Sequence, residues 1–188
     1  MSKNRSRVQQ TLTLHKSNTM EEIRNKVAES GLIQMDLAKY KPRRAMVGID
    51  VSEQLLEGLI LREKPFREWI KTNNWESFRG QSAYLFCSTD AIVPAWAYML
   101  IVSKLMEVDC PAIVGTELEL EKFLITEAIQ KEDLASYQDG KIIVKGCSDI
   151  RAIEFAMSAF VSHFQKAASS IMFGEPCSTV PVYKRPKA

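Results

Sequence analysis

The stretch QSAYLFCSTDAIVPAWAYMLIVSKLMEVDCPAIVGT, residues 81–116, gives the clearest indication of the fold class. It begins with a short apolar run, continues with a long and nearly all-apolar segment (91–108), and ends with a second short apolar run (111–116). Short apolar runs bounded by turns are typical of buried strands, and the long segment is typical of a helix. We interpret the stretch as a strand–helix–strand unit, with Asp90 as the N-cap of the helix and Pro94 in its first turn.

Strands and helices alternate on both sides of this unit. The further elements that the apolar periodicity predicts are a helix at 20–31, strands at 32–37, 44–51 and 58–61, a helix at 64–73, a helix at 118–131, a strand at 140–147 and a helix at 151–170. Such alternation implies parallel strands joined by right-handed helical crossovers. The sequence therefore predicts an α/β fold, in which residues 20–188 form a single domain with a mostly parallel or mixed sheet and helices packed on it.

Composition and charge narrow the class of protein. The 188 residues are 46% hydrophobic and 26% charged, which is ordinary for a globular domain. The longest apolar runs stop at about 13 residues, short of the roughly 20 that span a bilayer, so we expect no membrane association. Residues 1–19 carry +4 and no acid, whereas the whole chain carries +2, so the remainder carries −2. We interpret residues 1–19 as a disordered basic extension and expect no nucleic-acid partner.

The four cysteines are the strongest candidates for metal binding or catalysis in this sequence. No secretory signal is visible, so we expect a cytoplasmic location, where disulfides are disfavoured. Cys87 and Cys147 each end a predicted strand, and in one parallel sheet both would lie at the carboxyl edge, where such sheets bind ligands. Cys110 precedes its strand, and we interpret it as a packing residue. Cys177 follows the last helix in IMFGEPC, a segment that would have to turn back as an extended loop to reach the pair.

Three thiolates with one further ligand suit zinc or an iron–sulfur cluster. Asp90, three residues after Cys87, and Glu175, two before Cys177, are the candidates for the fourth ligand. Ordinary burial is the alternative for each thiol, because cysteine is among the most buried residue types. Candidate contacts to an anionic cofactor near these thiols are Lys145, Ser178 and Thr179.

Three segments together carry a family resemblance: CSTDAIVPAWAYML (87–100), KGC (145–147) and SSIMFGEPCSTVPVYKRPK (169–187). They resemble a family of small bacterial proteins catalogued only as a domain of unknown function, and the resemblance covers residues 20–188. It transfers no established activity and no catalytic residue, and Cys110 is not part of its signature. The signature positions matched in this chain are Cys87, Asp90, Cys147, Glu175 and Cys177.

The resemblance also implies a cellular setting, because genes of this family lie beside genes for iron–sulfur cluster assembly. An accessory part in cluster assembly or metal delivery follows as an expectation, with iron–sulfur assembly proteins as partners. Homodimer formation is left open by the sequence. The leading hypothesis is therefore an uncharacterised cytoplasmic protein that binds zinc or an iron–sulfur cluster.

Two other function classes remain open. The succession LEGLILREK, PFREWIKTN and AYLFCSTDAIVPAWAYML is similar to sulfate-transporter/anti-sigma-antagonist domains, which implies a protein-binding module without metal that uses the loop 88–94. A thiol-dependent enzyme would use Cys147 or Cys177, with Lys145 lowering the thiol pKa. The chain has only two histidines, so a general base for such an enzyme is scarce.

Overall fold

The protein is described here by a computed structural model that covers residues 31–146 and 149–186. The basic extension predicted at 1–19 lies outside these residues, as do almost all of the helix predicted at 20–31 and the candidate ligand Cys147. The described chain forms two larger sheets, which we name sheet A and sheet B, and one short two-stranded hairpin.

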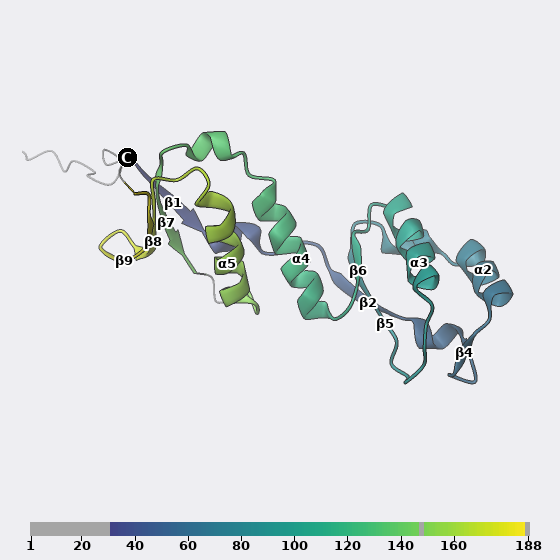
Figure 1. The fold of residues 1–188 in the computed structure, drawn as a ribbon. Coiled ribbons are helices and arrows are strands. Elements are labelled where there is room, and N and C mark those ends of the chain that lie inside the picture. The colour runs from purple at the N-terminus through teal and green to yellow at the C-terminus, as the bar shows by residue number, and fades with distance from the viewer. Residues whose placement is uncertain (1–30, 147–148, 187–188) are drawn as a thin grey trace, which may run out of the picture.

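Sheet A has four strands in the order β1 (Leu32–Asp36), β7 (Lys141–Lys145), β8 (Ser170–Glu175) and β9 (Ser178–Lys184). The first three strands are parallel, and β9 returns antiparallel to β8 as a hairpin. Helix α5 (Ile153–Phe164) connects β7 to β8 and packs on the sheet (Figure 1). Fully buried members of this core include Leu37, Ile142, Phe160, Phe164 and Ile171.

Sheet B has three parallel strands in the order β2 (Met46–Asp50), β5 (Ser82–Phe86) and β6 (Ala112–Val114). One face is covered by α3 (Ala95–Glu107), and α2 (Glu63–Thr72) packs against α3. These elements build a second core around β5 and α3, whose fully buried members include Phe66, Leu85, Ile101 and Leu105.

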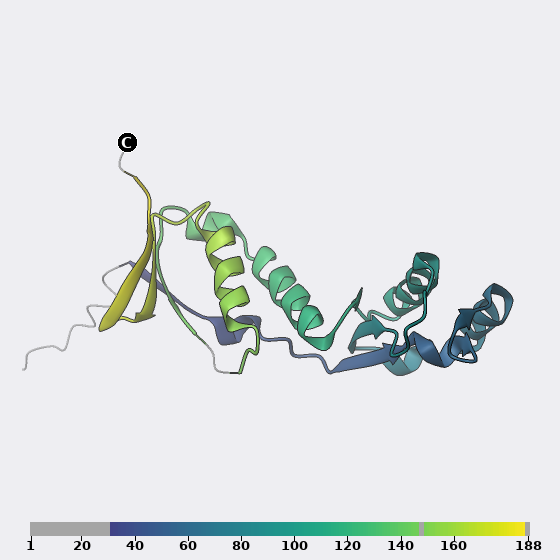
Figure 2. The ribbon, with the colours of Figure 1, turned by 60° about the horizontal axis from the view of Figure 1, so that its bottom comes forward.

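Helix α4 (Glu117–Gln130) joins the two halves of the fold, and Figures 1 and 2 show it between the sheets. It contacts β2, β5 and β6 as well as α5. The remaining elements are η1 (Leu37–Tyr40), η2 (Val51–Gln54), β3 (Leu55–Leu56), β4 (Ile60–Leu61), η3 (Trp75–Phe78) and η4 (Leu134–Tyr137). Among the described helices, none is long and apolar enough to cross a membrane.

The predicted fold class is confirmed: the chain is an α/β domain with mostly parallel strands and helices packed on them. The expectation that Cys87 and Cys147 follow strands of one sheet is wrong, because β5 belongs to sheet B and β7 belongs to sheet A. Helix α4 carries the chain from β6 to β7, and β7 pairs with β1 rather than with β6. That long-range pairing is a property of the tertiary structure and leaves no trace in local periodicity.

Two local expectations are also corrected. Helix α3 begins at Ala95, because Pro94 adopts an extended conformation (φ −61°, ψ 140°) and occupies the N-cap, so Asp90 does not cap the helix. The segment after the last helix is not an extended loop but strand β8 and its hairpin partner β9. Gly174 (φ +123°) permits the close approach of the two strands, since a Cβ there would lie 2.5 Å from the Ser178 carbonyl oxygen.

Candidate functional site

The carboxyl edge of sheet B carries a compact polar cluster around Asp50, the last residue of β2. Its Oδ1 accepts hydrogen bonds from the backbone N–H of Ser52 (2.9 Å) and of Ser88 (3.1 Å). The two serine hydroxyls lie 3.0 Å apart. Burial opposes ionisation, but the hydrogen bonds from Ser88 and Ser52 lower the pKa of Asp50 to about 2. Asp50 is therefore a fixed negative charge that ties the loop after β5 to the loop after β2.

Cys87 lies beside this cluster, directly after β5, and is half-buried. Its thiol is directed at its own loop, because Sγ lies 3.5 Å from the Thr89 carbonyl oxygen and 3.3 Å from Thr89 Oγ1. Burial, together with the nearby Cys87 and Asp50, raises the pKa of Tyr98. Within the described residues, no histidine or lysine forms a hydrogen bond or ion pair with Cys87.

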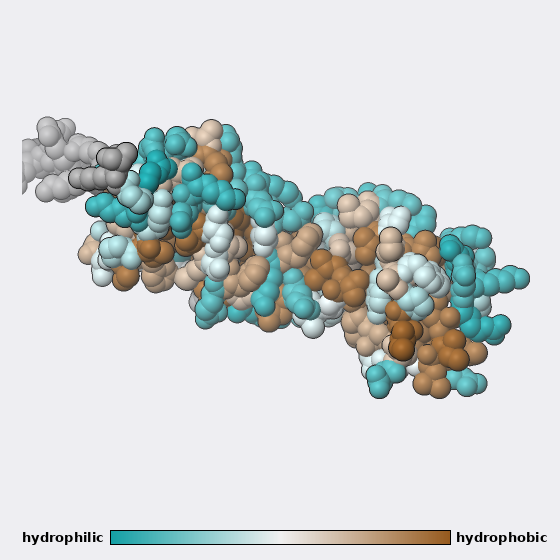
Figure 3. Space-filling model, viewed as in Figure 1, coloured by the Kyte–Doolittle hydropathy of each residue, from teal (hydrophilic) through white to brown (hydrophobic). Residues whose placement is uncertain are grey.

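A group of exposed apolar side chains surrounds the same edge, and we call it the edge patch: Leu56, Leu59, Ile60 and Ile92. Ile92 is 94% exposed, Leu59 64% and Ile60 62%. The hairpin β3–β4 lies against the loop after β5, because a Cβ on Gly58 would lie 3.8 Å from Thr89 Cγ2. Figure 3 shows hydrophobic surface in the region that β4 occupies in Figure 1. Exposed apolar groups gathered in this way are typical of an interaction surface.

The carboxyl edge of sheet A carries a second polar cluster. Lys145, the last residue of β7, has its Nζ 3.4 Å from Asp36 Oδ2 and 4.0 Å from Glu175 Oε1. Asp36 ends β1 and Glu175 ends β8, so three neighbouring parallel strands each contribute one charged residue. These side chains border a small cavity of about 220 Å³. One ammonium and two carboxylates give this edge a net negative charge.

The β8–β9 hairpin turns at Pro176 and Cys177, beside this second cluster. Cys177 is exposed, and it is separated by only one residue from the candidate ligand Glu175. Of the two hydroxyls predicted to contact an anionic cofactor, Ser178 is exposed, and the Thr179 hydroxyl lies 3.8 Å from the Met172 sulfur. The structure therefore brings Lys145 to Glu175 and leaves the role of the two hydroxyls as a prediction.

The predicted thiol ligands are divided between the two edges. Cys87 and Asp90 follow β5 of sheet B, whereas Glu175 ends β8 of sheet A and Cys177 lies in the turn after it. Figures 1 and 2 show α4 between the two sheets. Residues 31–146 and 149–186 contain no group of three histidine, cysteine, aspartate or glutamate side chains that could hold a metal ion. Cys110 is fully buried in the core of sheet B, as predicted, and burial raises the pKa of its thiol.

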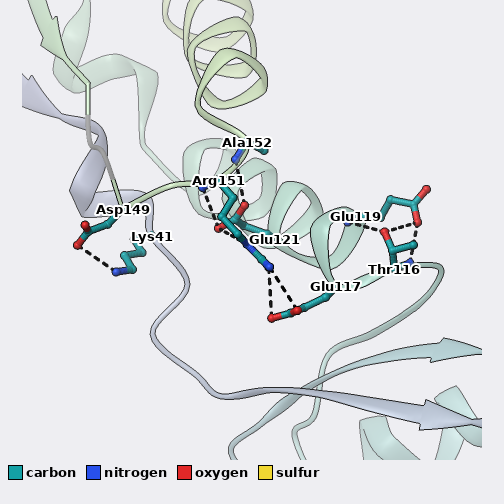
Figure 4. A network of polar contacts seen from close by, with 8 residues as sticks. All are labelled: Lys41, Thr116, Glu117, Glu119, Glu121, Asp149, Arg151 and Ala152. Atoms are coloured by element: carbon teal, nitrogen blue, oxygen red, sulfur yellow. Dashed lines mark hydrogen bonds and ion pairs between the residues drawn. The ribbon is translucent and has the colours of Figure 1, made fainter.

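A network of polar contacts surrounds the N-terminus of helix α5 (Figure 4). The sequence patterns did not predict it. Glu121 is 4% exposed, and its carboxylate accepts from the backbone N–H of Ala152 (3.1 Å) and of Arg151 (3.4 Å). Ala152 is the N-cap of α5 and has no capping side chain of its own. Glu121 of α4 thus supplies the missing cap. The available signal was a charged residue at a core position of α4, directly after the buried Leu120.

Comparison with known proteins adds one match. Neither curated proteins nor solved structures show a match to this chain. The family model described as "Protein of unknown function (DUF2480)" matches residues 21–185, which is most of the chain and includes both polar edges. The protein therefore belongs to this family of unknown function.

Proposed function

We propose that this protein acts by binding a partner protein through the edge patch. The observation that carries the proposal is that four large apolar side chains stay exposed at one end of sheet B, and that Ile92 is 94% exposed. Burying such side chains in an interface is worth about 1.5–3 kcal/mol each when burial is complete. In the isolated domain these four side chains are exposed to water, so this stabilisation is absent. Burying them against a partner protein would supply it. The proposed function is therefore that of a protein-binding module and not that of a metal site built from Cys87, Cys147 and Cys177.

The charges around the edge patch define the chemistry of the partner. Glu53, Glu57 and Asp90 are exposed and lie in the segments that carry the patch, against one exposed cation, Arg62. Asp50 adds a fixed negative charge at the same edge. We therefore expect a partner surface with an apolar centre and a basic rim, because complementary charge steers association and rejects other surfaces.

The partner class to test first is the iron–sulfur cluster assembly machinery. The family resemblance implies this setting through the neighbourhood of the genes. Purified scaffold and carrier proteins of cluster assembly can each be titrated against the full chain in a direct binding assay. A scaffold with an apolar, basic-rimmed surface is the expected binder.

The experiment compares Ile92→Asp and Leu59→Asp with the control Val180→Asp. Val180 lies on β9 of sheet A and is 62% exposed, which matches the exposure of Leu59 and Ile60. Each variant places one carboxylate on an exposed apolar position, so loss of folding is not expected and circular dichroism checks it. We expect the two patch variants to lose at least about tenfold in affinity, which is about 1.4 kcal/mol. Equal binding by all three variants would refute the edge patch.

A second candidate function, metal binding at the carboxyl edge of sheet A, is supported by the strand order. β7 and β8 are parallel neighbours, so their carboxyl ends adjoin. Cys147 follows β7 by two residues, Glu175 ends β8, and Cys177 lies in the next turn. Two thiolates and a carboxylate are a ligand set that zinc accepts, and cysteine thiolates also hold iron–sulfur clusters. Cys87 and Asp90 lie on the other sheet and are not part of this set.

Elemental analysis of the variants tests this second candidate. Protein purified without chelator and protected from oxygen is expected to carry zinc or iron in the wild type and in Cys87→Ser. Cys177→Ser is expected to lose the metal. Full retention of metal in Cys177→Ser, or its loss in Cys87→Ser, would contradict a site at sheet A. This result is independent of the binding assay, so the two functions can be separated.

A further inference from the structure

A cavity lined by five basic residues lies at the other end of sheet B. The cavity has a volume of about 370 Å³ and lies between the connection from η1 to β2 and the second half of α4. It reaches the start of β5, whereas the edge patch lies beyond the strand's end. Its basic lining residues are Lys39, Lys41, Arg43, Arg44 and Lys131, against the acidic residues Asp109 and Glu127.

Four of the five basic residues of the lining form ion pairs: Lys39 with Glu132, Lys41 with Asp149, Arg44 with Asp109 and Lys131 with Glu127. Arg44 Nη2 lies 2.8 Å from Asp109 Oδ2, so this guanidinium is held in place by its own partner. Lys131 Nζ lies 3.9 Å from Glu127 Oε2. Arg43 forms no ion pair with any residue of the described chain. Arg43 is therefore the lining cation without an acidic partner among the described residues, and its guanidinium is available to an external anion.

A buried hydroxyl without a partner points to a ligand at the same place. Ser82 is fully buried and lines the cavity, and its Oγ has no hydrogen-bond partner among the described residues. Side chains alternate along β5, so Ser82 is directed away from α3, which packs on Ala83 and Leu85. It is directed to the face that α4 covers, and α4 lines the cavity. Buried hydroxyls are rarely left without a partner, so this one is an unused donor.

Tyr40 adds a second hydroxyl to the lining. Its Oη is buried and also lacks a hydrogen-bond partner among the described residues. Burial, with the nearby Glu132 carboxylate, raises the pKa of Tyr40, so the hydroxyl stays protonated at neutral pH. The nearby Glu132 carboxylate competes for this hydroxyl, so Ser82 supplies the hydroxyl that is assigned to the ligand.

We propose that this cavity binds a small molecule that carries phosphate, with Arg43 and the Ser82 hydroxyl as its principal contacts. The planar guanidinium of arginine matches two phosphate oxygens at once, and hydroxyls supply further donors. The volume lies at the lower end of the range for small-ligand sites. Pro42, Leu124 and Ala128 give the rest of the ligand an apolar wall. The cations line one cavity instead of forming the extended stripe that tracks a nucleic-acid backbone.

The test uses inorganic pyrophosphate as the probe and isothermal titration calorimetry of the full chain at low salt. Saturable binding is expected for the wild type. Arg43→Gln is expected to weaken it about tenfold, because the bidentate contact is lost. Arg43→Lys keeps the charge and should fall between the two, and Ser82→Ala should weaken binding several-fold without changing the charge. The matched control is Lys64→Gln, which removes one exposed cation from α2.

Three results would overturn the proposal. The first is the absence of saturable heat with wild-type protein. The second is an equal loss of affinity in Lys64→Gln and Arg43→Gln, which would mean that pyrophosphate responds to net charge alone. The third is displacement of pyrophosphate by a single-stranded oligonucleotide at lower concentration than by inorganic phosphate or nucleotides, which would make the surface a nucleic-acid site. Selective loss in Arg43→Gln and Ser82→Ala supports the cavity.

Discussion

Glu121 provides the sharpest test of the packing between α4 and α5, and the perturbation is Glu121→Gln. The glutamine keeps the size of the side chain and one acceptor oxygen, but it removes the charge. Hydrogen bonds to charged groups contribute about 1.5–3 kcal/mol, against about 0.5–1.5 kcal/mol for neutral pairs. Glu121 accepts two such bonds from backbone N–H groups, at 3.1 Å and 3.4 Å, and it also faces the positive end of α5.

These contributions predict a loss of about 2 kcal/mol in the free energy of unfolding, which corresponds to roughly 4–8 °C in Tm for a chain of this length. Urea denaturation and thermal unfolding, both followed by circular dichroism, measure the two quantities. The matched control is Glu117→Gln, because Glu117 contacts the same Arg151 at 3.2 Å but is 44% exposed. An exposed ion pair is worth about 0–1 kcal/mol. A loss in Glu121→Gln no larger than in Glu117→Gln would refute the buried-cap argument.

Three further predictions follow from burial and charge. Phe160→Ala, at a fully buried position of the sheet A core, should cost about 3–5 kcal/mol of unfolding free energy in urea titrations. Iodoacetamide labelling followed by peptide mass spectrometry should modify the exposed Cys177 well before the buried Cys110, and labelling of both at one rate in the native protein would contradict their placement. Asp50 has its pKa lowered to about 2 by hydrogen bonding, so its contribution to stability is present above its unfolded pKa and is lost as the pH falls towards 2. The wild type should therefore lose more stability than Asp50→Asn between pH 5 and about pH 2, as acid titration of the unfolding transition would measure.

Local elements of this fold could be predicted because each leaves a periodic pattern in the sequence. The strand before Cys87 is a short apolar run, and the helix after it is long and apolar, so β5 and α3 were found with small errors at their ends. The N-terminal boundary of α3 was missed because Pro94 is compatible with a first turn but in this chain caps the helix in an extended conformation. Such alternatives differ by little local free energy, and the tertiary context decides between them.

The division into two sheets could not be predicted from the same patterns. Lys141 of β7 pairs with Leu32 of β1, more than a hundred residues earlier in the chain. No local feature of the β7 sequence indicates that β1 is its neighbour. The sequence pattern predicts one mostly parallel or mixed sheet, and in one parallel sheet the strand ends before Cys87 and Cys147 would share an edge. Because β7 pairs with β1, the strands that precede Cys147 and Cys87 belong to different sheets.

The candidate site was predictable only in part, for a related reason. Periodicity assigned thiols to strand ends, and Cys87 does follow β5. It could not show that Ile92 is exposed or that Asp50 collects the hydrogen bonds of two loops, because exposure and hydrogen bonding arise from segments distant in sequence. The unpartnered hydroxyl of Ser82 is likewise visible only when α4 covers the sheet.

Quantitative binding of a purified iron–sulfur assembly protein to the wild type, Ile92→Asp and Val180→Asp decides whether the edge patch is the docking surface. We expect wild type and Val180→Asp to bind equally and Ile92→Asp to bind at least about tenfold more weakly. Equal affinity of Ile92→Asp and Val180→Asp for a protein that binds the wild type would show that the partner contacts another surface, and the edge patch would lose its proposed role.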